Sequence, residues 1–316
     1  MSQPLSSPPV AGNQPNRPHR TVTVSSLLPP NDMQLALQAY LPSFGQVRWV
    51  DRTGSTNVDL YTQARHSQAS ARRPWLLGTH LQDSGRGRAG RTWQNRAGAN
   101  LMFSCAFDVF LPARQLPALS LVAGMAVCTV LRRHLHPEHQ NQLTMKWPND
   151  IQWRSAKLAG ILVEATRAGT ARLAADHHVV IVGMGLNLED GRALSQALDR
   201  RIADWAGVAR DDALAASASG MTLTAHIAEA WQQAFSHASS YGLEDLPQRY
   251  AAVDALAGQA IDILDDGRLL HTGIARGIDQ AGQLKLHNHA GNQLISVGEV
   301  SVRHQHRPAR ASTSSP

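Results

Sequence analysis

Three arginines alternate with three glycines in one short stretch, which runs Gly85, Arg86, Gly87, Arg88, Ala89, Gly90, Arg91, Thr92, Trp93. Glycines allow backbone N–H groups to come close to a ligand, because they carry no Cβ. One guanidinium group can donate two parallel hydrogen bonds to the oxygens of a phosphate or a carboxylate, and each such hydrogen bond contributes roughly 1.5–3 kcal/mol. The pattern therefore predicts an anion-binding loop, with a solvated basic turn as the alternative.

The same stretch matches the Gly-x-Gly-x-x-Gly pattern of dinucleotide-binding folds, which also need a preceding strand, a helix at the last glycine and an acidic residue about 20 positions later. Residues 75–79 are compatible with the strand, and Asp108 has a suitable spacing. After Gly90, however, the residues are turn formers without a helical apolar period. No Gly-Lys pair occurs in the chain, which excludes a Walker A loop. We therefore expect the loop to connect two strands.

Lysine is rare in this chain of 316 residues and occurs only at Lys146, Lys157 and Lys285. Arginine has replaced it elsewhere, so the remaining lysines are candidates for roles that arginine cannot fill. Lys157 interrupts an otherwise apolar segment. Its ammonium either reaches the surface along its aliphatic stem or points into a cleft, where it would neutralise a carboxylate or a phosphate.

The net charge of +6 fits contact with nucleic acid or phosphorylated ligands, although much of the excess lies near the two termini. Cys105 and Cys128 lie in apolar surroundings without Cys-x-x-Cys spacing, which predicts buried free thiols and a cytoplasmic protein. No apolar run reaches bilayer length.

The composition predicts four segments. Residues 1–32 are expected to be a disordered leader, because repeated prolines oppose the amphipathic helix of an organellar transit peptide, the alternative interpretation. Residues 33–255 are expected to form a large domain, and residues 256–303 a small one. Residues 304–316 are expected to be a disordered tail.

Hydrophobic periodicity predicts helices near residues 33–41, 120–133 and 222–237, and one that begins at Thr56 with a Thr56–Asp59 capping box. Strands are expected at residues 47–50, 75–79, 101–110, 143–147, 157–164 and 179–183. This order favours an α+β fold with a mixed, largely antiparallel sheet covered by helices. From residue 259 onward, short alternating segments separated by tight turns predict a small β-barrel.

Taken together and in this order, five polar segments and the C-terminal strand resemble the biotin–protein ligases. They are Ser-Thr-Asn at 55–57, Gln82 followed by the glycine–arginine stretch, Lys-Trp-Pro-Asn-Asp at 146–150, Lys-Leu-Ala-Gly-Ile-Leu-Val-Glu at 157–164, Gly-Met-Gly-Leu-Asn-Leu at 183–188 and Gly-Glu-Val-Ser-Val-Arg at 298–303. The resemblance implies that residues 33–255 are a class II synthetase-like catalytic domain that binds biotin and ATP, and that residues 256–303 are an SH3-like domain.

The resemblance also implies a reaction in two steps. Biotin and MgATP first form biotinyl-5′-adenylate and pyrophosphate, and the adenylate then acylates one lysine of the biotin carboxyl carrier domain of acetyl-CoA carboxylase or a related carboxylase. ATP and Mg²⁺ are thus the expected cofactors, without a tightly bound prosthetic group, and the sequence does not identify the Mg²⁺ ligands.

By the same resemblance, residues are expected to contact biotin at Ser55, Thr56, Asn57, Gln82, Gly85, Arg86, Gly87, Arg88, Lys157 and Gly160. Those expected to contact the nucleotide are Arg88, Arg91, Trp93, Lys146, Asn149 and Asn187. Arg88 and Lys157 are the catalytic candidates, because attack of a carboxylate on a phosphate concentrates negative charge that fixed cations must stabilise. Asp150 is a third candidate, for orienting or deprotonating the acceptor lysine.

Several alternatives remain at this point. A lipoate or octanoate ligase of the same fold would use a pocket for a flexible chain. A nucleic-acid-binding module would explain the arginines but not Lys157 and Asn187 within apolar segments. Residues 134–139 carry three histidines and a glutamate without a His-Glu-x-x-His arrangement, which we interpret as a solvated helix end. About fifty residues precede Ser55, too few for a winged helix-turn-helix, so we expect a monofunctional ligase without direct DNA binding or membrane contact. A homodimer remains open.

Overall fold

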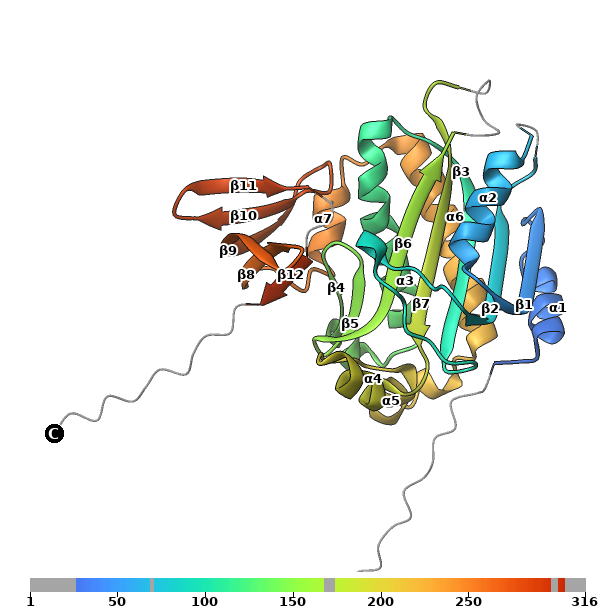
Figure 1. Ribbon diagram of the computed structural model, residues 1–316. Coiled ribbons are helices and arrows are strands. Elements are labelled where there is room, and N and C mark those ends of the chain that lie inside the picture. The colour runs from blue at the N-terminus through green and yellow to red at the C-terminus, as the bar shows by residue number, and fades with distance from the viewer. Residues whose placement is uncertain (1–26, 69–70, 168–173, 297–300, 305–316) are drawn as a thin grey trace, which may run out of the picture.

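The computed structural model describes residues 27–68, 71–167, 174–296 and 301–304. Its larger sheet has seven strands in the order β1-β2-β3-β7-β6-β5-β4 (Figure 1). Their bounds are β1 Gln46–Thr53, β2 Trp75–Gln82, β3 Asn100–Phe110, β4 Leu143–Lys146, β5 Asp150–Trp153, β6 Ala156–Thr166 and β7 His177–Asn187. Strands β1 and β2 are parallel, and the other neighbours are antiparallel. The prediction of a mixed, largely antiparallel sheet is confirmed.

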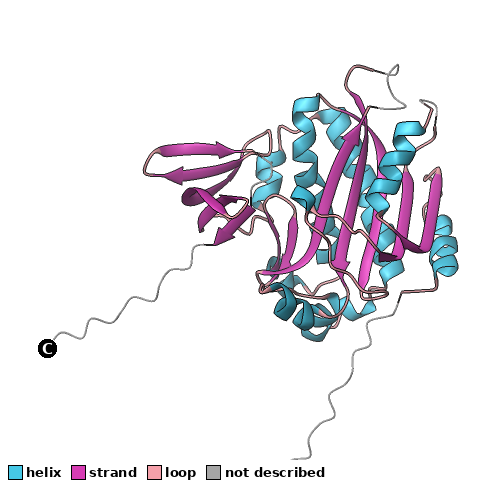
Figure 2. Ribbon diagram, in the orientation of Figure 1, coloured by secondary structure: helices cyan, strands magenta, loops and turns pink. Residues whose placement is uncertain are grey.

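Helices cover both faces of this sheet (Figure 2). α2 lies on one face, against β2, β3, β6 and β7, whereas α1, α3 and α6 pack together on the other. The helix bounds are α1 Pro30–Tyr40, α2 Thr56–His66, α3 Leu119–Arg133, α4 Gly191–Leu198, α5 Trp205–Asp211, α6 Gly220–Tyr241 and α7 Leu246–Ala251. The helices expected near residues 33–41, 120–133 and 222–237 are therefore all found.

Strand β3 separates the two sides of the core, because successive side chains of a strand point to opposite faces. Phe103 and Phe107 face the larger cluster, where their rings lie 5.2 Å from Trp231 and 5.3 Å from Phe235 of α6. Ser104, between them, faces α2. The fold thus places a hydroxyl group at the centre of the sheet, on the face that carries the site described below.

One helical stretch of the described residues, Ala113–Arg133, is long and apolar enough to cross a membrane by length and composition. Most of this stretch is buried inside the protein, since 67% of its most apolar 18-residue segment is buried. We interpret it as the core helix of the fold, since eleven residues of α3 are buried.

The C-terminal part forms a second, five-stranded antiparallel sheet in the order β11-β10-β9-β8-β12. The strands are β8 Ala260–Asp265, β9 Arg268–Ile278, β10 Leu284–Asn288, β11 Gly291–Ile295 and β12 Ser301–His304. The tight turns expected near Gly267, Gly282 and Gly291 are found, and each of these glycines has a positive φ. Within the described part of the chain β11 and β12 do not pair, so the sheet is open and not a closed barrel.

The two sheets are joined near the start of α3. The buried indole N–H of Trp147 donates a hydrogen bond to the carbonyl oxygen of Gly282, at 3.0 Å, in the turn between β9 and β10. A Cβ at Gly282 would lie 3.1 Å from that of Ala118. The second sheet is therefore hydrogen-bonded to the segment that carries the Lys-Trp-Pro-Asn-Asp motif.

The predicted capping box at α2 is wrong. The N-cap is Ser55, one residue earlier than expected. The hydroxyl of Thr53 in β1 donates to the Asp59 carboxylate at 2.5 Å, and the hydroxyl of Thr56 bonds to groups on the sheet. Tertiary partners have thus replaced the local capping pair. The predicted tail beyond residue 304, most of the predicted leader and residues 298–300 lie outside the described residues.

We predict that Trp231→Ala destabilises the fold by about 3–5 kcal/mol, because it removes a fully buried ring and leaves a cavity in the core. Tyr241→Ala, on the same helix, is the control: that side chain is 74% exposed, and we expect a change of at most about 0.5 kcal/mol. Urea unfolding monitored by circular dichroism measures both, and equal midpoints for the two variants would contradict the described core.

Candidate active site

One cavity lies on the α2 face of the larger sheet, at the ends of α2 and β2 and beneath the glycine–arginine loop (residues 85–93). Its lining comes from segments that are far apart in the sequence. It consists of Ser55, Thr56, Asn57, Gln82, Arg86, Gly87, Arg88, Arg91, Thr92, Trp93, Ser104, Asn149, Asp150, Lys157, Gly160, Ile161, Leu162, Gly183, Met184, Gly185 and Arg200.

The glycine–arginine loop connects β2 to β3 and contains only a single 3₁₀ turn, Arg88–Gly90. Arg86 and Thr92 face each other across the loop, and the Trp93 N–H donates to the Gly85 carbonyl oxygen at 2.8 Å. Ala89 has a φ of 53°, in the left-handed region. The absence of a helix after Gly90 confirms that this is not a dinucleotide-binding fingerprint.

One end of the cavity is a network of hydrogen bonds among buried side chains. The Thr56 N–H donates to the Gln82 side-chain oxygen at 2.8 Å, and the hydroxyls of Thr56 and Ser104 lie 2.7 Å apart. Ser104 donates to the Asn57 oxygen at 2.6 Å, and the Asn57 amide donates to Glu164 at 2.9 Å. This end therefore presents fixed neutral donors and acceptors to a ligand.

Glycines on β6 and β7 make room for this arrangement. A Cβ at Gly183 would lie 2.0 Å from the Asn57 side-chain oxygen, and one at Gly185 would lie 2.3 Å from the Trp93 ring. A Cβ at Gly160 would be 3.1 Å from the same ring. The indole N–H of Trp93 is buried without a hydrogen-bond partner in the described protein, so a ligand acceptor can satisfy it.

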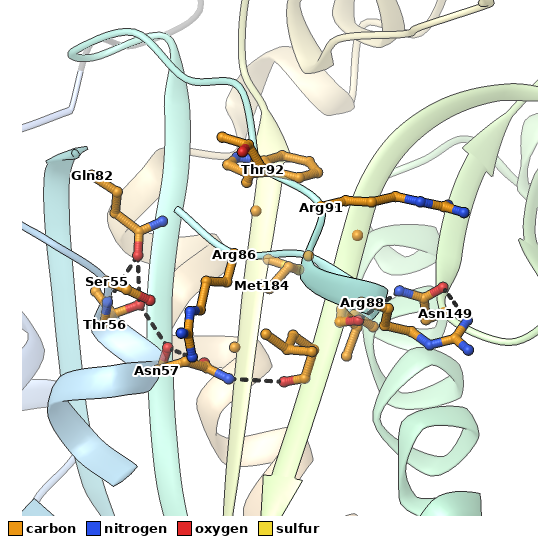
Figure 3. A pocket seen from close by; sticks show the side chains of 18 of the residues that line it. Ser55, Thr56, Asn57, Gln82, Arg86, Arg88, Arg91, Thr92, Asn149 and Met184 are labelled. Carbon is orange, nitrogen blue, oxygen red and sulfur yellow. Dashed lines mark hydrogen bonds between the residues drawn. The ribbon is translucent and has the colours of Figure 1, made fainter. Parts of the chain in front are cut away.

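The opposite end of the cavity is cationic (Figure 3). The Lys157 ammonium lies 2.5 Å from the Asp150 carboxylate and 5.6 Å from the centre of the Trp93 ring. The Arg88 guanidinium donates to the Asn149 side-chain oxygen at 3.5 Å. Burial lowers the pKa of Arg88, an effect that Asp150 opposes and Arg91 reinforces. Arginine stays charged at neutral pH nonetheless, so this end suits an anion.

Lys146 lies behind this cationic end, opposite Asp150 in the β4–β5 pair. Burial lowers the pKa of its ammonium; the nearby Asp150 raises it, and the positive charges of Lys157, Arg200 and Arg303 lower it. Arg303 belongs to β12, so the small sheet adds positive charge near the site. Asp150 is the carboxylate among several cations.

Most of the expected site residues line the cavity, but Gly85, Lys146 and Asn187 do not. Gly85 lies beside Gln82 and Trp93 at the base of the loop. Asn187 is buried, accepts from Asn100 at 3.2 Å and donates to the carbonyl oxygen of Ala203 at 3.1 Å. Its side chain thus ties β7 to its neighbours.

Sequence reasoning missed eight lining residues. Most of them belong to motifs that were recognised, where the strand alternation could have identified the cavity face, but Ser104 and Arg200 carry no sequence signal. The eight are Thr92, Ser104, Ile161, Leu162, Gly183, Met184, Gly185 and Arg200. In the His134–His139 region, His139 lies 2.9 Å from Asp212, and no group of three metal-binding side chains occurs among the residues that the structure describes.

Comparison with known proteins places these features in a family. Residues 49–187 match the model of the biotin/lipoate A/B protein ligase family. The biotin–[acetyl-CoA-carboxylase] ligase of Mycobacterium tuberculosis is 31% identical over 81% of this chain and 88% of its own length. That of Paracoccus denitrificans is 32% identical over 79% of this chain and 97% of its own length. The chain belongs to the biotin–protein ligase family.

Two further comparisons agree. The bifunctional ligase/repressor BirA of Escherichia coli is 30% identical over 70% of this chain and 64% of its own length. The biotin protein ligase of Aquifex aeolicus, solved with biotin and ATP, superposes with a TM-score of 0.64 at 22% identity and covers 83% of this chain and all of its own. The structural match confirms the predicted ligase fold.

We predict that Gly183→Ala weakens ligand binding at this ligase site by at least about tenfold, because the added methyl group would displace the Asn57 side chain from its hydrogen bonds. Gly54→Ala is the matched control, since a Cβ there meets nothing within 4 Å. Calorimetric titration with biotin measures both variants. Wild-type affinity in Gly183→Ala would contradict the described packing.

Proposed function

We propose that the protein activates biotin with ATP and transfers it to a lysine of a biotin carboxyl carrier domain. The observation that carries this proposal is the continuity of one cavity from its neutral hydrogen-bonding end to its cationic end (Figure 3). Biotin has the same two-part chemistry, with a cyclic urea at one end and a carboxylate at the other.

The neutral end would hold the ureido ring. Ser55, Thr56, Asn57 and Gln82 all line it and offer donors and acceptors at fixed positions. Arg86 and the backbone at Gly87 extend this end toward the loop. A rigid set of polar partners favours a ring with matching groups over a flexible hydrocarbon chain, because unpaired buried polar groups cost about 1–3 kcal/mol each. This argues against lipoate or octanoate as the substrate.

The first step joins biotin to AMP. A carboxylate oxygen of biotin attacks the α-phosphorus of ATP, the bond to the bridging oxygen breaks, and pyrophosphate leaves. Lys157 and Arg88 stabilise the negative charge that collects between the two reactants. Trp93 and Asn149 would border the nucleotide, and Arg91 and Arg200 would add positive charge on its phosphate side.

The second step transfers biotin. The neutral amine of the acceptor lysine attacks the carboxyl carbon of the adenylate, and AMP leaves. Asp150 lines the cavity with its side chain 26% exposed, so it can orient this amine or accept its proton. Adenylation converts the biotin carboxylate into the uncharged acyl group of a mixed anhydride. Lys157 then has no biotin carboxylate to neutralise and keeps its ion pair with Asp150.

Magnesium would arrive with ATP. Asp150 is the carboxylate among the lining residues, and Lys157 already pairs with it. This donor set fits a metal held mainly by phosphate oxygens and water, the usual mode for Mg²⁺ on nucleotides. Mg²⁺ supplies charge neutralisation on the phosphates.

The buried thiols of Cys105 and Cys128 are consistent with a reducing, cytoplasmic setting. Burial raises the pKa of the Cys128 thiol to about 12, and that of Cys105 is also raised well above its usual range. Neither thiol is therefore activated for acyl transfer.

The proposed function is tested by incubating the protein with biotin, MgATP and a carboxylase carrier domain, followed by intact mass spectrometry of the carrier. We expect one biotinyl group per carrier, which depends on ATP. A carrier that stays unmodified with biotin but is acylated when lipoate or octanoate replaces it would assign the protein to the other branch of the family.

We predict that Lys157→Ala lowers the rate of adenylate formation about 100- to 1,000-fold, because a fixed charge at the reaction centre is lost. Lys285→Ala, at the exposed lysine of β10, is the matched control and should keep wild-type activity. The double variant Lys157→Ala/Asp150→Asn separates the effects: recovery of the rate in the double variant would show that an unpaired Asp150 caused the loss.

We predict that Arg88→Ala releases the reactive adenylate, because the half-buried guanidinium closes the loop over the phosphate side of the cavity. Released adenylate would biotinylate lysines of an unrelated protein added to the reaction, which a streptavidin blot detects. Arg276→Ala, at an exposed arginine of β9, should label the carrier alone. Equal selectivity in the two variants would exclude this role for Arg88.

A further inference from the structure

Glu164 lies next to the cavity but does not line it. It is the third in a row of alternate residues on β6, after Gly160 and Leu162, which do line the cavity. Since alternate residues of a strand share a face, Glu164 continues the cavity face beyond its neutral end. The Glu164 carboxylate is not one of the charged groups at the cationic end of the cavity.

A chain of hydrogen bonds connects Glu164 to the cavity across three strands and α2. Its members are Gln82, Thr56, Ser104, Asn57 and Glu164. Gly183 leaves the space that this hydrogen-bond chain occupies, because a Cβ there would meet both Asn57 and Ser104. Thr56, Asn57 and Ser104 are each at most 4% exposed, so their hydrogen bonds are shielded from water.

The directions of the side-chain hydrogen bonds from Glu164 through Asn57 and Ser104 to Thr56 follow from the carboxylate. An ionised carboxylate accepts hydrogen bonds and donates none, so the Asn57 amide must turn its nitrogen toward Glu164, at 2.9 Å. The Asn57 oxygen then faces Ser104, which donates to it at 2.6 Å. Ser104 has a single proton, so across the 2.7 Å contact the Thr56 hydroxyl is the donor, and the Gln82 side-chain oxygen, 3.2 Å away, is the other acceptor within its reach.

Only lone pairs therefore remain on Thr56 and Ser104 for a ligand in the cavity. Both hydroxyls line the cavity, and the second N–H of the Asn57 amide is directed at the Leu162 carbonyl oxygen, at 3.4 Å. A donor comes from Arg86, which also lines the cavity and whose guanidinium lies beside Asn57 in Figure 3. A ligand that fits both must carry an N–H or O–H donor next to an acceptor, which is the arrangement in a cyclic urea.

We propose that Glu164 is a positioning residue that sets the direction of the hydrogen-bond chain, so that Thr56 and Ser104 accept from the ligand and the cavity selects a cyclic urea N–H. This inference rests on the proposed function and extends it to the basis of substrate selection. Glutamine at position 164 has the same shape but can donate as well as accept. With it, Asn57 can turn over and the chain can reverse, so that Ser104 donates to Thr56 and the ligand competes with the Gln82 side-chain oxygen, 3.2 Å away, for the Thr56 proton.

The experiment compares Glu164→Gln with the wild type by calorimetric titration without ATP. The ligands are biotin and a biotin methylated at either ureido nitrogen. We expect Glu164→Gln to bind biotin about tenfold more weakly, because a charged acceptor is replaced by a neutral one. One of the two methylated compounds is expected to bind the wild type more weakly than the other. The ratio of its dissociation constant to that of biotin should be about tenfold smaller in Glu164→Gln than in the wild type. Glu138→Gln, at an exposed glutamate whose side chain is 69% accessible, should match the wild type.

Ser104→Ala provides an independent arm, because it cuts the hydrogen-bond chain between Thr56 and Glu164. Ser104→Ala alone should also reduce the preference for biotin over the methylated compound. The double variant Ser104→Ala/Glu164→Gln should bind biotin as strongly as Ser104→Ala does. Three results would overturn the proposal. The first is that the two substitutions together lower the affinity by the product of their separate effects. The others are that Glu164→Gln weakens the binding of biotin and of the methylated compound equally, or that it binds both as the wild type does. Because binding is measured without turnover, failure of the wild type to label the carrier is a separate result that bears on the proposed function.

Discussion

Asp150 is the carboxylate on which the cationic half of the site depends. Lys157 lies 2.5 Å from it, and its charge raises the pKa of both Arg88 and Lys146 against the lowering effect of their burial. Positive groups this close repel one another, and burial deprives them of solvation by water. One shared counter-charge keeps them together in the unliganded protein. Substrate phosphates would then supply the missing negative charge, so the binding energy of ATP is directed at the place where the reaction needs it.

The neutral half of the site depends on glycines of β6 and β7, which carry no side chains. Gly160, Gly183 and Gly185 leave the sheet surface bare where the Trp93 ring and the Asn57 side chain lie. The polar network is therefore supported by strands of the sheet, which hold side chains more rigidly than loops do. The glycine–arginine loop closes the other side and is itself held by Asn95, which accepts from the Gln82 N–H at 3.0 Å and donates to the Gln82 carbonyl oxygen at 2.9 Å. A rigid floor beneath a loop suits a site that must enclose a reactive intermediate.

Much of this site could be predicted from sequence because its motifs, taken together, resemble those of the biotin–protein ligases, and because they lie on elements with clear periodicity. Lys157 and Gly160 belong to an apolar strand, and the absence of a helical period after Gly90 located the loop between strands correctly. Tertiary contacts account for the failures. The predicted capping box did not form, because Asp59 is hydrogen-bonded to Thr53 of β1 and Thr56 to Ser104 of β3. Asn187 does not line the cavity, because its side chain is hydrogen-bonded to Asn100 and Ala203. Arg200 reaches the cavity from the segment after α4, and no local pattern marks such an approach.

The central claim is that the neutral and cationic ends act on a single molecule, biotin, while it is joined to AMP. The most direct measurement is exchange of radiolabelled pyrophosphate into ATP, without a carrier protein, which reports the reversible first step alone. We predict exchange that requires biotin and magnesium together. Exchange driven by lipoate or octanoate and absent with biotin would contradict it.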